Sequence, residues 1–400
     1  MRLLNVIRSV DPASGGMAEG LRQSVAATRA MGHEEEVLTL DAPHDDWVRS
    51  FPATVHAIGP ATGLYGHCNR LVPWLRDNAP LYDAVVVHGL WQFHSLAVRR
   101  ALKGGPVPYF IYPHGMLDPW FKQRYPLKHL KKWLYWPWAD YRVLRDAAAV
   151  LFTAGEEARL AAQSFWLYRA RPAVVGYGVA LGEPSQLGSA DEFAQAWPAT
   201  RGKRVVLFLG RLHPKKGGDL LIEAFAELAD SEPSLHLVMA GPDDSSGVRA
   251  GLEALAARLG VAHRITWTGM LGGSAKWSAL KAAEVFALPS HQENFGIAVV
   301  EALAMGVPVL ISDKVNIWRE IVDGGAGHAG SDTVAGTADA LRRWLQLLPA
   351  ERDAMKLRAV ACYQQHFHMA SAARRLIDTI TPHARGALLL QPGATPNSRP

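Results

Sequence analysis

Short runs of apolar, often β-branched residues alternate with segments of helical length along most of the chain. Such runs are typical of strands that are buried on both faces of a parallel sheet. In the first part of the chain we expect these strands at residues 3–7, 36–40, 84–88, 109–112 and 148–153. The alternation of strands and helices predicts an α/β domain with a doubly wound parallel sheet.

A second series of strands follows a break in this pattern. Residues 181–203 are rich in turn-forming residues and have no periodicity, so we interpret them as a linker between two domains. Beyond the linker we expect strands at 204–209, 235–240, 264–268, 285–288 and 308–312. These patterns predict two Rossmann-like domains, residues 1–180 and 204–365. The last residues, 386–400, are rich in Pro, Gly, Asn and Ser, and we expect them to form a flexible tail.

The composition is that of a globular protein. A chain of 400 residues exceeds one ordinary core, and 49% hydrophobic with 20% charged residues excludes disorder as its main state. No apolar run reaches the ~18 residues of a membrane span, and Cys68 and Cys362 form no CxxC motif. We therefore expect a cytoplasmic protein without a disulfide framework or a cysteine zinc site. The net charge of +5 favours anionic partners.

Two glycine-rich loops follow expected strands, where ligands bind in open parallel sheets. Gly15 and Gly16 precede a helix expected from about residue 17, so a phosphate could approach its N-terminus; a tight turn is the alternative. In the second domain Arg211, Lys215 and Lys216 stand among glycines before another helix. This loop suits a diphosphate, with a solvated charge run as the alternative. GxxxxGK[ST] and GxGxxG are absent, which weighs against kinases, ATPases and ordinary dehydrogenases.

Two carboxylates stand eight positions apart in the segment after the strand expected at 285–288. Glu293 lies in a polar loop and Glu301 in the following helix, about 2.2 turns further on. They can therefore reach different parts of one long ligand. The structural alternative is that Glu293 caps the helix and Glu301 is an exposed or paired surface charge.

These motifs together resemble the retaining glycosyltransferases of family 4, which have the GT-B architecture. The spacing of Glu293 and Glu301 is similar to the E-x7-E element of that family, within E-N-F-G-I-A-V-V-E-A-L-A-M-G-V-P-V. The G-R-L-H-P-K-K-G and S-G-G loops and Ala240-Gly241 also match. The resemblance implies two Rossmann-like domains that face a central cleft. It further implies that a C-terminal helix at about 366–382 packs back on the first domain.

The resemblance also implies roles for individual residues. Arg211 and Lys216 would hold the donor diphosphate, Glu293 the donor sugar, and Glu301 the nucleotide ribose. Further donor contacts would come from glycines and backbone groups at Gly15, Gly16, Gly241, Gly269, Met270, Asn294, Phe295 and Gly296. His114 follows an expected strand at the place of the family's active-site histidine. His88 also ends a strand and competes for that role, and either histidine could instead tie down a loop.

The implied reaction is a transfer of a hexose with retention of configuration. The donor would be a nucleotide-diphosphate sugar, for which we expect a GDP-mannose-like donor first and a UDP-sugar second. The acceptor would be a lipid-linked molecule or a polysaccharide in cell-surface glycan biosynthesis. Preorganised cations and N–H dipoles can stabilise the departing diphosphate without a metal, and no D-x-D occurs, so we expect no cofactor and no metal. The alternatives are an epimerase or phosphorylase of similar architecture and a non-catalytic nucleotide-sugar binding protein.

Residues 120–145 combine four tryptophans with seven cations against one acid, Asp140, a local charge of +6. Tryptophan beside lysine and arginine is typical of a helix that lies on an anionic membrane surface, so we predict peripheral attachment to the inner membrane face. Alternatively, the tryptophans are core residues, or the cations line the acceptor cleft for a soluble anionic sugar. Nucleic acid is not expected as a partner, because no recognised binding motif accompanies the charge.

Overall fold

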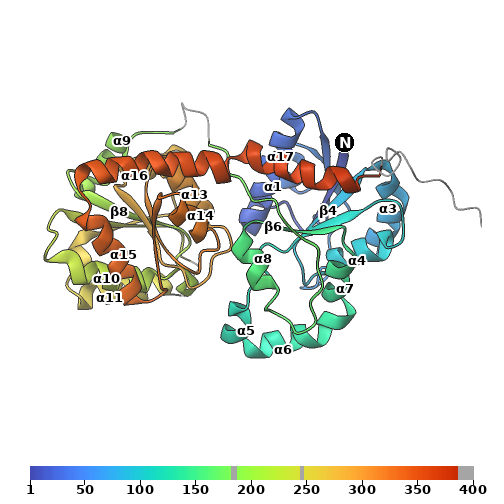
Figure 1. Ribbon diagram of the computed structural model, residues 1–400, viewed down its shortest axis with the longest axis horizontal. Helices are drawn as coiled ribbons and strands as arrows, with labels where there is room; N and C mark the ends of the chain where they lie inside the picture. The colour runs from blue at the N-terminus through green and yellow to red at the C-terminus, as the bar shows by residue number, and fades with distance from the viewer. Residues whose placement is uncertain (182–186, 244–246, 386–400) are drawn as a thin grey trace, which may run out of the picture. The chain divides into compact units, whose positions relative to one another are not determined.

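The computed structural model describes residues 1–181, 187–243 and 247–385, and the chain divides into two compact units. Unit 1 contains Met1–Gly178 and the segment from Met369 onward, and unit 2 contains Val179–His368. The predicted tail, 386–400, lies outside the described residues. Figure 1 shows the elements of each unit along the chain.

Unit 1 is built on a parallel sheet that, over the described residues, has seven strands in the order β3-β2-β1-β4-β5-β6-β7. The strands are β1 (Arg2–Ile7), β2 (Glu34–Thr39), β3 (Thr54–Ala57), β4 (Ala84–His88), β5 (Tyr109–Tyr112), β6 (Ala149–Phe152) and β7 (Pro172–Val174). The strand order reverses between β1 and β4, which is where doubly wound sheets open a crevice for ligands.

Helices cover this sheet and include one from the far end of the chain. They are α1 (Gly16–Ala30), α2 (Asp46–Arg49), α3 (Leu71–Asn78), α4 (Phe93–Leu102), α5 (Trp120–Arg124), α6 (Pro126–Tyr135), α7 (Asp140–Asp146), α8 (Gly155–Ala161) and α17 (Met369–Ile380). Helix α17 packs against α1, and the two lie side by side in Figure 1. It also buries Leu376, Ile377 and Ile380 against the sheet, so residues far apart in the sequence share one core.

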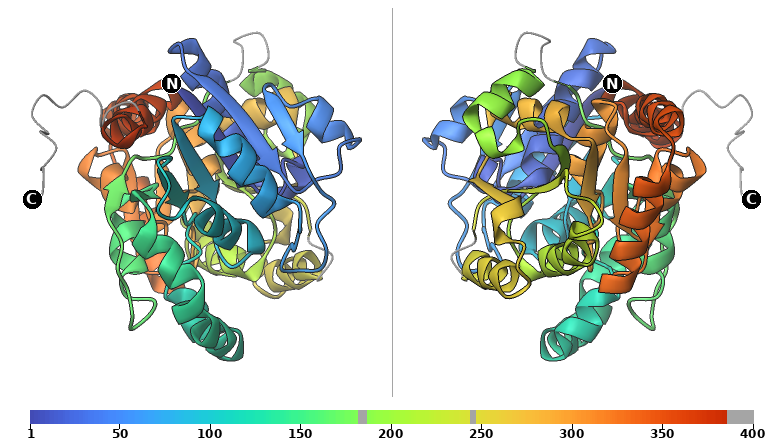
Figure 2. Two further views of the ribbon diagram at one scale, coloured as in Figure 1. Left: turned by 90° about the vertical axis from the view of Figure 1, so that its right-hand side faces the viewer. Right: turned by 90° about the vertical axis from the view of Figure 1, so that its left-hand side faces the viewer.

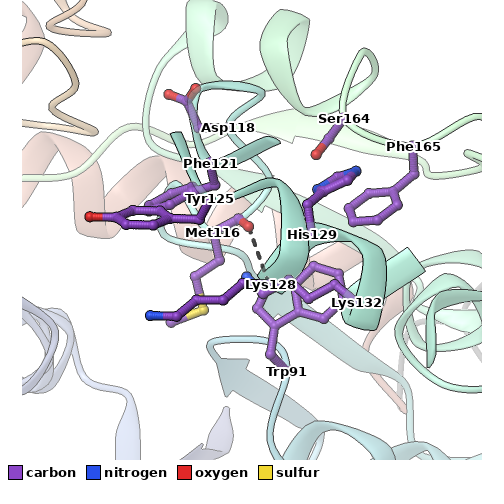
Figure 3. Close-up of a pocket in the computed structure, with 10 residues that line it drawn as sticks. All are labelled: Trp91, Met116, Asp118, Phe121, Tyr125, Lys128, His129, Lys132, Ser164 and Phe165. Carbon is purple, nitrogen blue, oxygen red and sulfur yellow. Dashed lines mark hydrogen bonds between the residues drawn. The ribbon is translucent and has the colours of Figure 1, made fainter. Parts of the chain in front are cut away.

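Helices α5 and α6 lie at the outer edge of unit 1, in teal in Figures 1 and 2. Beyond them Trp136 is completely buried and stacks on Phe165, with ring centroids 4.2 Å apart. Trp138, in contrast, is 70% exposed. A pocket lies between α5, α6 and the loops that follow β4 and β5 (Figure 3). The tryptophans of residues 120–145 therefore have different roles, since one belongs to the core and another to the surface.

Unit 2 repeats the same plan with six parallel strands, among the residues described, in the order β10-β9-β8-β11-β12-β13. The strands are β8 (Arg204–Leu209), β9 (Leu235–Ala240), β10 (Ile265–Gly269), β11 (Val285–Leu288), β12 (Val309–Ser312) and β13 (Gly327–Gly330). The helices are α9 (Ala190–Ala196), α10 (Gly218–Ala229), α11 (Val248–Arg258), α12 (Gly273–Ala282), α13 (Ile297–Ala304), α14 (Trp318–Asp323), α15 (Val334–Gln346) and α16 (Pro349–Cys362).

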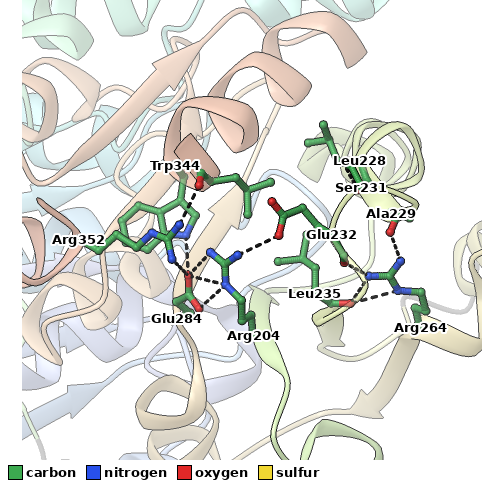
Figure 4. A network of polar contacts seen from close by, with 11 residues as sticks. Arg204, Leu228, Ala229, Ser231, Glu232, Leu235, Arg264, Glu284, Trp344 and Arg352 are labelled. Carbon is green, nitrogen blue, oxygen red and sulfur yellow. Dashed lines mark hydrogen bonds and ion pairs between the residues drawn. The ribbon is translucent and has the colours of Figure 1, made fainter. Parts of the chain in front are cut away.

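An ion-pair network ties together the amino ends of the strands in unit 2 (Figure 4). Arg204, the first residue of β8, pairs with Glu284 at 2.7 Å and with Glu232 at 3.0 Å. Glu284 precedes β11 and also accepts a hydrogen bond from the Trp344 indole N–H at 3.2 Å. This network lies at the sheet edge opposite the loops that carry the predicted site, so we interpret it as structural.

Helix α9 lies inside the segment predicted as a linker, and that part of the prediction is wrong. Ser189 and Glu192 form a reciprocal capping box at its start, which satisfies N–H groups that a helix end leaves free. Ser189 also contacts α12, because its backbone N–H donates a hydrogen bond to Ser278 Oγ at 3.1 Å. Phe193 is buried against Trp197. The helix is short, so its apolar positions are too few to produce a visible period.

Candidate active site

Two loops meet at the carboxyl edge of the sheet in unit 2. The loop after β8 ends in a turn at Pro214–Lys216, and Gly217 follows with φ at 67°. A Cβ at Gly217 would lie 2.1 Å from the carbonyl oxygen of Pro289 in the loop after β11, so only glycine fits. The His291 N–H also donates to the carbonyl of Lys215 at 2.8 Å. These contacts hold the basic loop against the acidic one.

Lys216 and Glu293 form an ion pair where these loops meet. Their side chains are mostly buried, at 19% and 15% exposure. Burial by itself would raise the pKa of the Glu293 carboxyl, but the charges of Lys216 and Lys215 outweigh it and lower the pKa below its usual value. The Glu293 backbone is held as well, since its N–H donates to Lys314 and its carbonyl accepts from Asn316. The site therefore presents a fixed carboxylate beside a fixed ammonium.

The start of α13 lies directly beyond this pair. Gly296 has φ at 75° and caps the helix, so the N–H groups of Ile297 and Ala298 have no helical partner, while that of Val299 donates to the Gly296 carbonyl at 2.9 Å. Asn294 is held by Asn316, whose amide donates to Asn294 Oδ1 at 3.2 Å. Phe295 is buried and meets Phe367 edge to face. Such a helix start favours an anion.

Glu301 lies on the inner face of α13 and is paired with a residue that sequence analysis did not single out. Its side chain is 9% exposed, and Lys276 of α12 approaches Glu301 Oε1 at 2.6 Å. Glu301 is therefore not an exposed charge, but it is paired, as the structural alternative allowed. The sequence offered one signal for this partner, namely that Lys276 is a lysine in the helix that follows β10.

Arg211 is exposed and makes no side-chain hydrogen bond or ion pair with residues in the described ranges. Next to it, Gly241 approaches so closely that a Cβ would lie 1.8 Å from the Gly210 carbonyl oxygen. The Gly241 N–H donates to Gly269 at 2.8 Å, and Met270 beyond it is 76% exposed. The loops after β8, β9 and β10 therefore share one edge, with Arg211 available to a ligand.

The predicted residues of unit 1 lie at the carboxyl edge of its own sheet. Gly15 caps α1 with φ at 87°, and no atom lies within 4 Å of where its Cβ would be, so space at this helix start is open. Gly16 is the first residue of α1, and its carbonyl accepts from the Tyr177 hydroxyl at 3.2 Å.

His88 and His114 are close together in unit 1 and do not compete for one place. His88 ends β4, and His114 follows β5 in a left-handed conformation, with φ at 51°. The backbone beside His114 is held by Glu157, which accepts from the Gly115 N–H at 2.6 Å. Burial lowers the pKa of His114 to about 4 and that of His88 well below its usual value, so both rings are neutral at pH 7.

Among the residues that the structure describes, no group of three or more His, Cys, Asp or Glu side chains is arranged to hold a metal ion. In the same residues, no helix combines the length and apolar character needed to cross a membrane.

Comparisons with known proteins agree with this architecture. A family model described as "Glycosyl transferases group 1" matches residues 189–359, and one described as "Glycosyl transferase 4-like domain" matches residues 15–178. D-inositol 3-phosphate glycosyltransferase of Nocardia farcinica is 32% identical over 249 residues, which cover 60% of this chain and 54% of the relative. The same-named protein of Actinosynnema mirum is 36% identical over 209 residues, 48% of each chain. The chain spans about half the length of these curated relatives.

Solved structures of similar fold cover nearly the whole chain. HepE from Anabaena, in complex with UDP and glucose, has a TM-score of 0.73 at 19% identity, covering 95% of this chain and 99% of that one. Sucrose-phosphate synthase from Thermosynechococcus elongatus has a TM-score of 0.70 at 19% identity, covering 94% and 97%. Fold, site and family matches together define a glycosyltransferase. The chain belongs to the glycosyltransferases of GT-B architecture, and its features fit family 4 among them.

Proposed function

We propose that this protein transfers a hexose from a nucleotide-diphosphate sugar, with retention of configuration and without a metal, to a lipid-linked or polysaccharide acceptor in cell-surface glycan biosynthesis. The observation that supports this best is the Lys216–Glu293 pair at the start of α13. It offers a cation and helix N–H groups to a diphosphate beside a carboxylate that can accept from sugar hydroxyls.

The remaining donor contacts follow from the same edge of unit 2. Arg211 is free to grip diphosphate oxygens in fork geometry, and Glu301, already paired with Lys276, is assigned to the ribose hydroxyls. The base is assigned to the edge formed by Gly241, Gly269 and Met270. Gly15, Gly16 and His114 of unit 1 are assigned to the diphosphate and the reacting sugar.

The chemical step needs negative charge on the departing diphosphate to be stabilised. Arg211, Lys216 and the N–H groups at the start of α13 supply fixed positive ends for that charge, which is the usual source of large rate effects. In the same-face mechanism, the bond from the anomeric carbon to the phosphate oxygen breaks as the acceptor oxygen attacks. The leaving phosphate oxygen takes the acceptor proton, so no protein nucleophile is required.

Thermal-shift measurements with GDP and UDP test donor binding, because a ligand that binds only the folded state raises its stability. Product analysis then separates the reaction classes. A transferase releases nucleoside diphosphate only when an acceptor is present, an epimerase changes the donor sugar without releasing it, and a phosphorylase requires inorganic phosphate. Nucleotide binding without any turnover over a broad acceptor screen would favour a binding protein.

A second observation supports attachment to an anionic membrane surface. Leu127, Leu130 and Leu134 stand at helical spacing on α6 and are 78%, 55% and 62% exposed. Lys122 and Arg124 of the preceding helix, α5, are exposed as well. An apolar face bordered by cations is what an interfacial helix presents to lipid headgroups.

Co-sedimentation with vesicles of phosphatidylcholine, with and without phosphatidylglycerol, tests this attachment. We expect binding that needs the anionic lipid and that is lost in Leu127→Ser/Leu134→Ser. Leu348→Ser is a matched control, because Leu348 is equally exposed, at 65%, in unit 2. Failure to bind at low salt would rule the attachment out.

A further inference from the structure

The pocket beneath α6 is formed by segments of unit 1 that share the ligand edge of its sheet. Trp91 follows β4, while Met116 and Asp118 follow β5, two and four positions beyond His114. Phe121, Tyr125, Lys128, His129 and Lys132 come from α5 and α6 and their junction, and Ser164 and Phe165 close the far side (Figure 3). The empty interior is about 60 Å³. Because ~10–15 Å³ of such space holds one water, the pocket accepts a substituent of several atoms.

Helix α6 has its polar and apolar faces reversed relative to an ordinary surface helix. Tyr125, Lys128, His129 and Lys132 follow the spacing of one helical face and line the pocket. The leucines at positions 127, 130 and 134 lie on the opposite face and are exposed. Burying an ammonium while exposing leucine costs free energy, so packing within unit 1 does not explain the arrangement.

Lys132 extends its ammonium over aromatic faces rather than to an acid. Its Nζ lies 4.4 Å from the Trp91 ring centroid and 5.6 Å from that of Phe121. Within the described part of the chain it makes no ion pair and no side-chain hydrogen bond. Cation–π contacts hold the charge in place but leave its three N–H donors for a ligand.

Asp140 is the acid that acts on Lys132 at longer range; its Oδ1 has hydrogen-bond partners, and its buried Oδ2 has none among the described residues. It is fully buried, and its Oδ1 accepts hydrogen bonds from the Trp91 backbone N–H at 3.4 Å and from Ser95 Oγ at 3.3 Å. Burial raises the pKa of Asp140 to about 7, so its negative charge is only partly present at neutral pH. Asp140 therefore does not neutralise Lys132 fully.

The indole of Trp91 is held rigidly as the floor of this pocket. Its backbone has φ at 67°, which is unusual for a bulky residue, and its ring N–H donates to the Met116 carbonyl at 3.1 Å (Figure 3). Strain of this kind persists where the surrounding structure enforces it and is concentrated at ligand sites. The Asp118 carboxylate accepts a hydrogen bond from the Trp120 backbone N–H at 2.8 Å.

We propose that this pocket binds an anionic substituent of the acceptor, a sugar carboxylate or phosphate, with Lys132, held over the Trp91 ring, as its cation. Lys128, whose Nζ lies 5.1 Å from the Tyr125 ring centroid at the pocket wall, adds a second positive charge. The inference rests on the proposed function, because it makes the pocket the acceptor side of that reaction. The loop that carries His114 continues into Met116 and Asp118, which line the pocket. One segment therefore connects the pocket to the histidine that we assign to the reacting sugar.

Binding of soluble probes to the full chain tests the pocket without requiring turnover. Glucuronate, glucose 6-phosphate and glucose are titrated by ligand-observed NMR against the wild type and Lys132→Met. We expect the wild type to bind one or both anions and to bind glucose at least about tenfold more weakly. The Lys132→Met variant should bind the anions at least about tenfold more weakly than the wild type does. The stronger of the two anions identifies the substituent. Lys132→Arg, which keeps the charge and can stack on Trp91, should retain binding.

Lys131→Met is the matched control, since Lys131 is the neighbouring lysine and is exposed. It removes the same charge from the same helix and should leave anion affinity unchanged. Equal losses of anion affinity in both methionine variants, or equal binding of glucose and the anions, would overturn the proposed role of the pocket.

Thermal shifts with UDP and GDP are measured on the wild type and on each variant. A wild type that binds the anions but neither nucleotide overturns the proposed function while the role of the pocket stands. A wild type that binds nucleotide but neither anion overturns the pocket alone.

Discussion

His88 Nδ1 and His114 Nε2 lie 3.1 Å apart, and the pair continues a chain of hydrogen bonds from the interior of unit 1. Asn5 donates from Nδ2 to Glu35 at 2.7 Å and so presents Oδ1 to His88 Nε2, at 3.1 Å. His88 must then donate from Nε2 and accept at Nδ1. His114 consequently donates from Nε2, and its Nδ1 keeps a lone pair.

This chain makes His88 a positioning residue for His114. We expect His88→Leu to lower kcat about 10- to 100-fold, the size seen for partners that orient a working histidine, with little change in nucleotide binding. His114→Ala should lower kcat at least as much, and the double variant no further. Steady-state kinetics and GDP or UDP thermal shifts measure both effects. Additive losses in the double variant would show that the two histidines act separately.

Arg211→Ala should reduce turnover about 10²- to 10³-fold, because it removes a fixed positive charge facing the leaving diphosphate. Its free energy of unfolding should change by less than ~0.5 kcal/mol, since Arg211 is exposed and has no side-chain partner among the described residues. Lys216→Ala should lose similar activity but also stability, because Glu293 is left partly buried without its cation. Near-normal transfer by both variants would contradict the diphosphate role.

Gly217→Ala should lower Tm by several degrees and abolish the nucleotide-induced shift. The new Cβ would lie 2.1 Å from the Pro289 carbonyl oxygen, and residues other than glycine disfavour a φ of 67°. Gly251→Ala in α11 is the control, because no atom lies within 4 Å of its Cβ position and alanine is the better helix former. Equal melting of both variants would mean that the loop contact does not matter.

His94 should make the protein less stable as pH falls. Burial lowers its pKa to about 4, whereas the unfolded chain has a value near 6.5, so the unfolded state binds the proton first. The stabilising contribution is present above pH 6.5 and is lost between about pH 6.5 and 4. His94→Gln keeps a neutral donor for the His88 carbonyl, which His94 Nε2 meets at 2.8 Å, but does not titrate. The difference in unfolding free energy between wild type and variant should therefore shrink over this pH range.

Turnover should persist in excess EDTA, because the proposed mechanism uses only protein groups to stabilise the diphosphate. Nucleoside diphosphate release with acceptor, with and without EDTA, measures this. Loss of activity that a divalent ion restores would contradict metal-independent transfer.

The sequence by itself determined the plan of the molecule. Central strands such as β4 and β8 are buried on both faces, and that burial requires the continuous apolar runs by which they can be recognised. Three edge strands, β3, β7 and β13, are partly exposed and lack such runs, and they were not predicted. The fourth edge strand, β10, is partly exposed as well but was predicted, at 264–268. The E-x7-E spacing likewise depends only on the local geometry of one loop and one helix.

Only the tertiary structure decided which distant side chains meet. The pairing of Lys216 with Glu293, and of Glu301 with Lys276, follows from parallel strands that bring loops far apart in the chain to one sheet edge. The same packing joins His88 to His114 and turns Lys132 of α6 toward the pocket and the leucines of α6 outward. A helical period identifies two faces but not which one meets the protein, because that choice depends on what the rest of the fold places beside them.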